Sequence, residues 1–386
     1  MKLRRFDYSQ FEDQPTEWKI VDSSFGDINL IVGRNATGKT KTISVIGALA
    51  QLFSEIDELK WGEGNYKVEF EDDDQMVLYA LEYTGLKIVN EQLIIDGKTL
   101  LTRGDDGIGK IYLEQLKKPL DFQTSDNRVA AFAKRDSIQH PFLDRLFRWG
   151  QGLIRFDFGT PLGRNKIDIK QQPDQDGDLN LDLDSKGTQG VIDKFRFGKR
   201  DYGTPFVDAI IADMAHIEYE LDEIGLATPQ DVLITIQNIP ARIQAIYVKE
   251  SDLIAKTFQH HMSQGMFRAL SVIIQINYSL FTNQPSCIQI DDIGEGLDFA
   301  RSSALVNLII EKIKGTATQL IMTTNDRFIM NSVPLEYWII LERRGGQTIH
   351  HNYRNSKEMF EDFELTGLSN FDLFSSNYYL RNGDDL

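Results

Sequence analysis

Eight residues near the start of the chain have the types and spacing of a phosphate-binding loop (P-loop). They match the pattern G-x-x-x-x-G-K-[ST] in full and are Gly33, Arg34, Asn35, Ala36, Thr37, Gly38, Lys39 and Thr40. Glycines let backbone N–H groups approach phosphate oxygens, and a helix that begins at the loop adds further N–H donors. We expect Lys39 to reach the β and γ phosphates of a nucleotide and the Thr40 hydroxyl to bind Mg²⁺.

The residues on either side of the loop support this interpretation. An apolar run, residues 28–32, precedes it, and Ile43, Ile46, Ala50 and Phe53 then recur at helical spacing. Two short strings typical of GTPases, at 106–109 and 165–168, follow no apolar run and are interpreted as polar turns. The sequence therefore predicts a nucleotide site between a buried strand and a helix.

A second carboxylate site is predicted in the last third of the chain. The run SCIQIDDIGEGLD places Asp291 and Asp292 directly after an apolar strand. A P-loop ATPase needs such a strand-end carboxylate to hold Mg²⁺. We therefore predict Asp291 as a Mg²⁺ ligand together with Thr40.

Composition and charge limit the class of protein. The 386 residues are 41% hydrophobic and 26% charged, which is typical of a globular chain. No secretory signal and no apolar run long enough to span a membrane occurs, and there is a single cysteine, so we expect a cytoplasmic protein with no membrane partner. The net charge of −16 disfavours binding to nucleic acid. One basic run, KFRFGKR at 194–200, is interpreted as one solvated face of a strand, with a nucleic-acid patch as the alternative.

The pattern along the chain predicts an α/β fold. Residues 2–9 and 17–22 read as strands, and 66–114 as an antiparallel meander with turn signals. From residue 264 helices and strands alternate, at 264–281, 286–291, 299–313 and 318–323, which indicates a largely parallel sheet. Between them lies a mixed insertion with an acidic loop, whose aspartates resemble a calcium loop only superficially because the required glycine and the terminal glutamate are missing.

Four segments in order resemble the motifs of ABC-type ATPases, and most closely those of the RecF/SMC-like and overcoming-lysogenisation-defect (OLD) group. They are the P-loop, the run HHMSQGMFRAL, the run DDIGEGLD and the run QLIMTTND. The resemblance implies a stand-alone head without coiled coil or nuclease domain. It divides the chain into an N-terminal ATPase lobe (1–114), an insertion (115–255), a C-terminal ATPase lobe (256–354) and an aromatic tail (355–386). The tail aromatics Phe371, Phe374, Tyr378 and Tyr379 either cover the head itself or dock a partner.

In such ATPases two heads stack head to tail, with each ATP between the P-loop of one and the signature helix of the other. The resemblance therefore implies ATP and Mg²⁺ as cofactors and a homodimer or higher homo-oligomer with composite ATP sites. Ser263, Gln264 and Gly265 open the signature helix, and Ser263 is a good N-cap. A helix N-terminus is suited to bind the γ-phosphate of a nucleotide held by the other copy.

Two residues depart from the family pattern. Asp292 stands where the class has a catalytic glutamate and is one methylene shorter, so slow hydrolysis is expected unless Glu295 or a backbone shift positions the water. Asn325 stands in the switch segment where histidine is usual, and an amide cannot become cationic. We therefore expect an ATP-dependent switch that controls a separate effector protein, as in bacterial anti-phage systems. The alternative is a RecF-like ATPase that acts on DNA.

Overall fold

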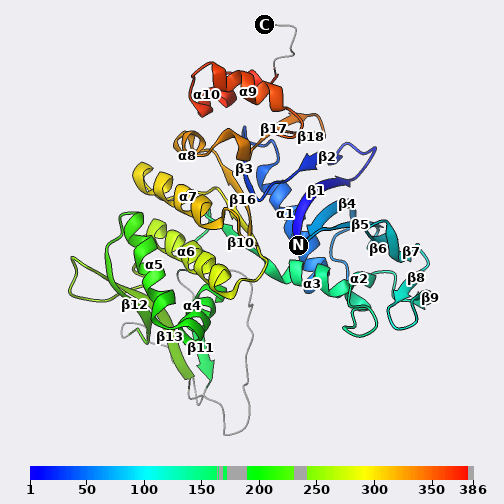
Figure 1. Cartoon of the computed structure of the whole chain (residues 1–386), viewed down its shortest axis with the longest axis horizontal. Helices are drawn as coiled ribbons and strands as arrows, with labels where there is room; N and C mark the ends of the chain where they lie inside the picture. Colours follow the sequence, from blue (N-terminus) through cyan, green and yellow to red (C-terminus); the bar gives the residue numbers. More distant parts are fainter. Residues whose placement is uncertain (163, 165–167, 172–188, 230–240, 381–386) are drawn as a thin grey trace. The chain divides into compact units, whose positions relative to one another are not determined.

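The computed structural model describes residues 1–162, 164, 168–171, 189–229 and 241–380 and divides into two compact units (Figure 1). Unit one comprises Met1–Leu153, Pro285–Gln289 and Ala317–Leu386, and unit two comprises Ile154–Gln284 and Ile290–Thr316. The acidic loop predicted within the insertion and the string at 165–167 lie outside the described residues. Each unit is described by itself.

Unit one is built on one large sheet. Its strands follow the order β16-β3-β17-β18-β2-β1-β4-β5-β6-β7-β8-β9, and residues 287–289 of β15 (Cys287–Asp291) pair with the free side of β16. The bounds are β1 (Lys2–Gln10), β2 (Trp18–Ser24), β3 (Ile28–Gly33), β4 (Glu63–Asp72), β5 (Gln75–Thr84), β6 (Lys87–Ile95), β7 (Lys98–Arg103), β8 (Ile108–Leu113), β9 (Lys118–Gln123), β16 (Gln319–Thr324), β17 (Trp338–Arg344) and β18 (Gln347–Asn352).

The helices of unit one include the helix that follows the P-loop and a group near the end of the chain. Figure 1 shows α9 and α10 close to α8 and to the β17–β18 hairpin, and α10 contacts α8. The bounds are α1 (Lys39–Ser54), α2 (Ala130–Ala133), α3 (Leu143–Gly152), α8 (Arg327–Ser332), η1 (Leu335–Tyr337), α9 (Lys357–Leu365), α10 (Asn370–Ser375) and η2 (Tyr378–Leu380).

Strand β3 occupies the middle of the sheet and leads into the P-loop. All six of its residues are buried, and it pairs in parallel with both β16 and β17. A strand buried on both faces between parallel neighbours reads as a continuous apolar run, which is why the sequence pattern identified it. From β1 outward through β4 to β9 the strands pair antiparallel, and the predicted meander is confirmed.

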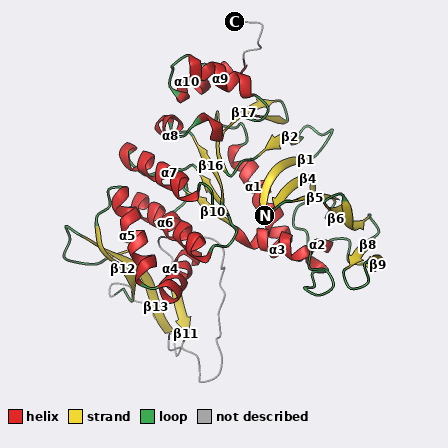
Figure 2. Cartoon of the chain, viewed as in Figure 1, coloured by secondary structure: helices red, strands yellow, loops and turns green. Residues whose placement is uncertain are grey.

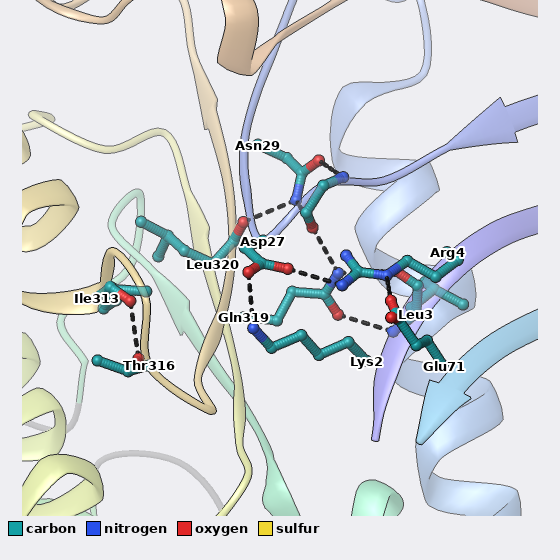
Figure 3. A network of polar contacts seen from close by, with 11 residues as sticks. Lys2, Leu3, Arg4, Asp27, Asn29, Glu71, Ile313, Thr316, Gln319 and Leu320 are labelled. Atoms are coloured by element: carbon teal, nitrogen blue, oxygen red, sulfur yellow. Dashed lines mark hydrogen bonds and ion pairs between the residues drawn. The ribbon is translucent and has the colours of Figure 1, made fainter. Parts of the chain in front are cut away.

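A polar network fixes the beginning of β3 (Figure 3). The Asn29 amide donates to the Leu320 carbonyl at 3.0 Å, and the buried Gln319 amide donates to the Leu3 carbonyl at 2.8 Å while its oxygen accepts from Leu3 N at 3.0 Å. Asp27 accepts from Lys2 Nζ at 2.8 Å. Because these side chains join the start of β3 to β1 and β16, the register of the P-loop strand is set before the loop begins.

Unit two is a helical group with a small sheet (Figure 2). The long helix α6 is almost wholly buried and contacts α4, α5 and α7. Asp213 joins three of these helices, because its carboxylate accepts from Asn277 Nδ2 at 2.6 Å and from Lys312 Nζ at 2.6 Å. The bounds are β10 (Leu153–Asp157), β11 (Asp168–Gln171), α4 (Gln189–Tyr202), α5 (Thr204–His216), β12 (Leu221–Ala227), β13 (Ala241–Glu250), β14 (Thr257–Phe258), α6 (Gln264–Thr282) and α7 (Phe299–Ile313).

The elements predicted for the last third of the chain are confirmed to within a residue, but one earlier prediction is wrong. The basic run 194–200 lies in helix α4, not in a strand. Its buried residues Val191, Ile192 and Phe195 recur at helical spacing, and a Cβ at Gly198 would collide with the ring of Phe206. The alternation of cations with Phe195 and Phe197 suggested a strand only because the window considered was too short.

Among the residues that the structure describes, no helix is long and apolar enough to cross a membrane.

We predict that His350 makes the stability of unit one sensitive to acid. This β18 side chain is 1% exposed, both ring nitrogens lack a hydrogen-bond partner in the described structure, and burial lowers its pKa from 6.5 to about 3. The folded state therefore disfavours the proton that the unfolded chain takes up below pH 6.5. Replacement of His350 by Leu removes this penalty, which amounts to about 1.4 kcal/mol per pH unit between pH 6.5 and about 3.

The measurement is urea unfolding of both proteins from pH 7.5 to pH 4.5, with the exposed His216→Gln variant as control. The free-energy difference between wild type and His350→Leu should move in favour of the variant as pH falls. A difference that stays constant over this range would contradict the assignment of the acid effect to His350.

Candidate nucleotide-binding site

The P-loop of unit one has a backbone shaped by two residues in the left-handed region. Gly38 has a φ of 110° and Ala36 a φ of 64°, and α1 begins at Lys39. A Cβ at Gly33 would lie 2.5 Å from Thr37 Oγ1, so only glycine fits there. The loop therefore curls tightly just before the α1 N-terminus, and a curled loop at a helix N-terminus is the cradle that a phosphate requires.

The lysine of the loop is held by the loop itself. Lys39 is 7% exposed, and its Nζ donates to the Gly33 carbonyl at 2.7 Å and to the Arg34 carbonyl at 3.3 Å. Thr37 Oγ1 also donates to the Arg34 carbonyl, at 2.8 Å. The Lys39 ammonium thus lies within the curl of the loop, while Arg34, Asn35, Ala36 and Thr40 are exposed beside it.

Residues far from the loop in sequence support it from behind. Trp18 Nε1 donates to Thr348 Oγ1 at 3.1 Å, and Thr348 Oγ1 donates to the Thr37 carbonyl at 3.2 Å. From β17, Arg343 Nη1 donates to the Ala36 carbonyl at 3.1 Å. These contacts stabilise the strained Ala36 turn, and sequence analysis did not single out their donors because no local pattern marks them.

A lysine just inside α1 adds to the positive charge at the loop. Lys41 Nζ lies 4.0 Å from the centre of the Trp18 ring. Burial, and after it the neighbouring Arg343 guanidinium, lowers the pKa of Lys41. Two like charges beside a helix N-terminus repel each other and the helix dipole, so this end of α1 favours an anion.

Asn325 lies at the same edge of the sheet as the P-loop. The parallel register pairs Thr324 of β16 with Val32 of β3, and Asn325 is the next residue, beside Gly33. Its side chain is exposed, and Asp326 follows as the N-cap of α8, accepting from Phe328 N at 2.6 Å. Unit one therefore brings together the predicted P-loop residues and the predicted switch residue.

The predicted Mg²⁺ ligand Asp291 belongs to unit two. Its carboxylate is nearly buried, and Arg155 Nη2 of β10 lies 3.5 Å from Asp291 Oδ2. The Asp291 carbonyl accepts from Phe158 N at 3.0 Å, which fixes the backbone of the strand end. Arg155 was not predicted as a site residue from the sequence. The only feature that marks it there is a charged residue among the apolar residues of β10.

The two candidates for positioning water follow in a tight turn. Asp292 has a φ of 54°, and its carbonyl accepts from Glu295 N at 3.1 Å. Aspartate tolerates the left-handed region better than most residues with a Cβ, and Glu295 is exposed at the surface of the turn. The turn places both carboxylates in unit two within four residues of Asp291.

The signature helix begins as predicted. Ser263 is the N-cap of α6, and its Oγ accepts from Met266 N at 3.1 Å. Gln264 is exposed and Gly265 is buried. A Cβ at Gly265 would collide with the Gly296 carbonyl, so the helix start and the turn after Asp292 touch through their backbones.

The buried side chain of Arg268 stabilises this contact between the start of α6 and the turn after Asp292. It is 4% exposed, and its guanidinium donates to the Glu295 carbonyl at 2.6 Å and to the Thr160 carbonyl at 3.1 Å. Burial, together with the nearby Arg164, lowers its pKa, against the attraction of Glu295. Within unit two, the signature residues and the carboxylate turn therefore form one rigid set.

Three of the four cations in the basic run on α4 have side-chain partners. Arg196 pairs with Asp193, and Arg200 Nε pairs with Asp201 Oδ1 at 2.6 Å. Lys194 Nζ lies 4.6 Å from the centre of the Tyr278 ring, and burial lowers its pKa. Among the described residues, no group of three or more histidine, cysteine or acidic side chains could hold a metal ion by itself.

Comparison with known proteins identifies the fold. No protein-family model and no curated protein matches the chain. Among solved structures, the chain is similar to an SMC head bound to the C-terminal winged-helix domain of ScpA, with a TM-score of 0.53 and 14% identity over 93% of this chain and 99% of that one. It is also similar to an SMC head domain with an extended coiled coil, bound to the C-terminal domain of ScpA derived from Pyrococcus furiosus, with a TM-score of 0.50 and 11% identity over 94% and 99%. The chain thus has the α/β fold of an SMC head domain.

Proposed function

We propose that this chain is an ABC-type ATPase switch that binds ATP, assembles with further copies of itself around the nucleotide and hydrolyses it slowly. The observation that carries the proposal is the P-loop: a complete pattern, a curled backbone and a supported Lys39 at the start of α1. The residues fit ATP, because a curled loop that leaves no room for a Cβ at Gly33 and ends at a helix N-terminus is the site that a triphosphate needs. Bound Mg²⁺, held by Thr40 and Asp291, would neutralise phosphate charge.

The signature residues support a composite site. Ser263 caps a helix of 19 residues whose first turn carries no acidic side chain, so this N-terminus favours an anion. In the proposed dimer, the γ-phosphate bound by one P-loop meets the Ser263 end of the other copy. The rigid contact between Gly265 and Gly296 would then transmit the position of the signature helix to the turn that holds Asp292 and Glu295.

We propose a protein effector rather than DNA as the partner, with anti-phage defence as the setting. The similar SMC heads were solved with domains of the protein ScpA, so a head of this fold can carry a protein partner. The net charge of −16 and the paired cations of α4 speak against the RecF-like alternative, because DNA binding depends on exposed, uncompensated lysines and arginines. The defence setting rests on the OLD-like motifs alone.

The composite site predicts complementation between two inactive variants. Lys39→Ala removes the phosphate contact and Ser263→Arg blocks the signature end, and each alone should lower phosphate release from Mg²⁺-ATP by at least about 100-fold. In an equimolar mixture, the mixed dimer has one site with an intact Lys39 and an intact Ser263. Activity should therefore return to about a quarter of the wild-type value, because half of the dimers are mixed and each carries one of two sites.

Phosphate release is measured against total protein concentration, since wild-type turnover per chain should also rise as dimers form. A mixture that stays as inactive as its components, beside an active wild type, would contradict the composite site. If phosphate release per wild-type chain does not change with protein concentration, this result would also count against the composite site.

Because the Asp292 side chain is one methylene shorter than glutamate, we predict that a longer side chain at this position increases the rate of ATP turnover. Asp292→Glu adds one methylene and restores the reach of the usual catalytic glutamate, so kcat should rise by about 10-fold or more. The left-handed backbone at this position costs glutamate some stability, and this cost is checked by thermal unfolding. Glu295→Gln serves as the matched control. If Glu295 is the residue that positions water, the control loses activity and Asp292→Glu leaves kcat unchanged.

A further inference from the structure

The segment 369–380, which contains α10 and η2, is fastened to unit one at its beginning. Ser369 and Asp372 form a capping box, with Ser369 N donating to Asp372 Oδ2 at 3.0 Å. Asn370 Nδ2 donates to the Val333 carbonyl at 2.9 Å, just after α8. Phe371 N donates to Asn331 Oδ1 at 2.8 Å. The segment therefore begins on the helix that follows Asn325.

Aromatic packing fastens the other end of the segment. The rings of Phe374 and Tyr379 stack at 6.3 Å, and Tyr379 lies 5.7 Å from the His351 ring of β18. Tyr378 packs edge-on against Phe363 of α9 at 5.2 Å. Both tyrosines are buried, so these aromatics cover unit one itself, the first of the two roles predicted for them.

Between the two anchors the segment reaches the P-loop. Asn377 adopts a φ of 56°, and its Oδ1 accepts a hydrogen bond from Nη2 of Arg34 at 3.0 Å. Arg34 also lies close enough to Tyr379 to oppose the rise that burial causes in the pKa of that phenol. No carboxylate of the described residues lies within ion-pair distance of Arg34, so its one side-chain partner there is a neutral amide.

This arrangement orients a guanidinium without neutralising it. A guanidinium carries five N–H donors in a planar fork, and Asn377 accepts from one of its nitrogens. The guanidinium keeps its positive charge and its remaining N–H donors, because an amide oxygen compensates a cation far less than a carboxylate does. Ordering a long arginine side chain costs conformational entropy, and a bond to Asn377, which the buried Tyr378 and Tyr379 follow directly, removes part of that cost from the binding step.

We propose that Asn377 is a positioning residue that holds Arg34 ready for the phosphates of the nucleotide in the same copy. The segment 369–380 then completes the ATP site from a distant part of the sequence and connects it to α8. This inference rests on the proposed function, since it assigns a second cation to the same P-loop.

The test is a double-mutant cycle on the full chain, with the affinity for Mg²⁺-ATPγS measured by calorimetry. Asn377→Gly removes the acceptor and leaves the left-handed backbone unstrained. It should weaken binding about 5-fold, and Arg34→Ala should weaken it about 10-fold or more. The double variant should bind like Arg34→Ala alone. Asn370→Ala, which removes an anchor of the same segment away from Arg34, is the matched control and should leave the affinity within about 2-fold of wild type.

The outcomes separate the inference from the function on which it rests. A wild type that binds no ATPγS would overturn the proposed ATPase. Binding that Arg34→Ala weakens and Asn377→Gly does not would overturn the positioning role alone. An Asn377→Gly effect that persists at full size without Arg34, or that Asn370→Ala reproduces, would reassign the segment to a structural role and overturn it as well.

Discussion

The burial of β3 is the constraint on which the rest of the candidate site depends. A strand with every side chain buried and a parallel neighbour on each side cannot shift by one residue without exposing apolar groups and breaking two ladders. The network of Asn29 and Gln319 fixes its first residues, and the register with β16 and β17 fixes its last. The P-loop therefore leaves the sheet at a defined place, and the left-handed residues Ala36 and Gly38 curl it ahead of the α1 N-terminus. Anion binding at the loop would therefore need no shift in the register of β3.

The P-loop is surrounded by positively charged side chains, although the chain as a whole is negatively charged. The protein carries a net charge of −16, yet Arg34, Lys39, Lys41 and Arg343 all lie at or beside the P-loop. Arg34, Lys41 and Arg343 contact an amide, an indole ring and a backbone carbonyl there, which orient these three cations without cancelling their charge. A local positive field in an acidic protein attracts a compact anion such as a triphosphate, while a long polyanion such as DNA also meets the surrounding negative surface.

The sequence predicted what local patterns encode. A periodic run with a clear start, such as the Ser263 cap, allowed the prediction of the P-loop, of the helices that begin at 264 and 299, and of the strands that begin at 287 and 319. Long-range partners were out of reach, because nothing near Arg343, Thr348 or Asn377 in the sequence marks them as neighbours of residues 33–38. The prediction of a strand at 194–200 was wrong for a related reason. Seven residues of alternating cations and phenylalanines fit a strand, and the helical spacing becomes visible only when the buried residues that precede residue 194 are included.

The two halves of the predicted machinery differ in how far they are prepared for chemistry. The P-loop in unit one already has a curled backbone that Thr348 and Arg343 hold through the Thr37 and Ala36 carbonyls, so nucleotide binding would require little rearrangement there. In unit two, Asp291 lies beside Arg155, and the short Asp292 stands on a left-handed turn that Arg268 holds in place through the Glu295 carbonyl. Arg155 would compete with Mg²⁺ for the carboxylate of the proposed ligand Asp291, and a fixed turn cannot extend a short side chain. In the proposed switch, such a division would favour nucleotide binding and would make hydrolysis depend on a change in unit two, as a switch requires and a fast motor would avoid.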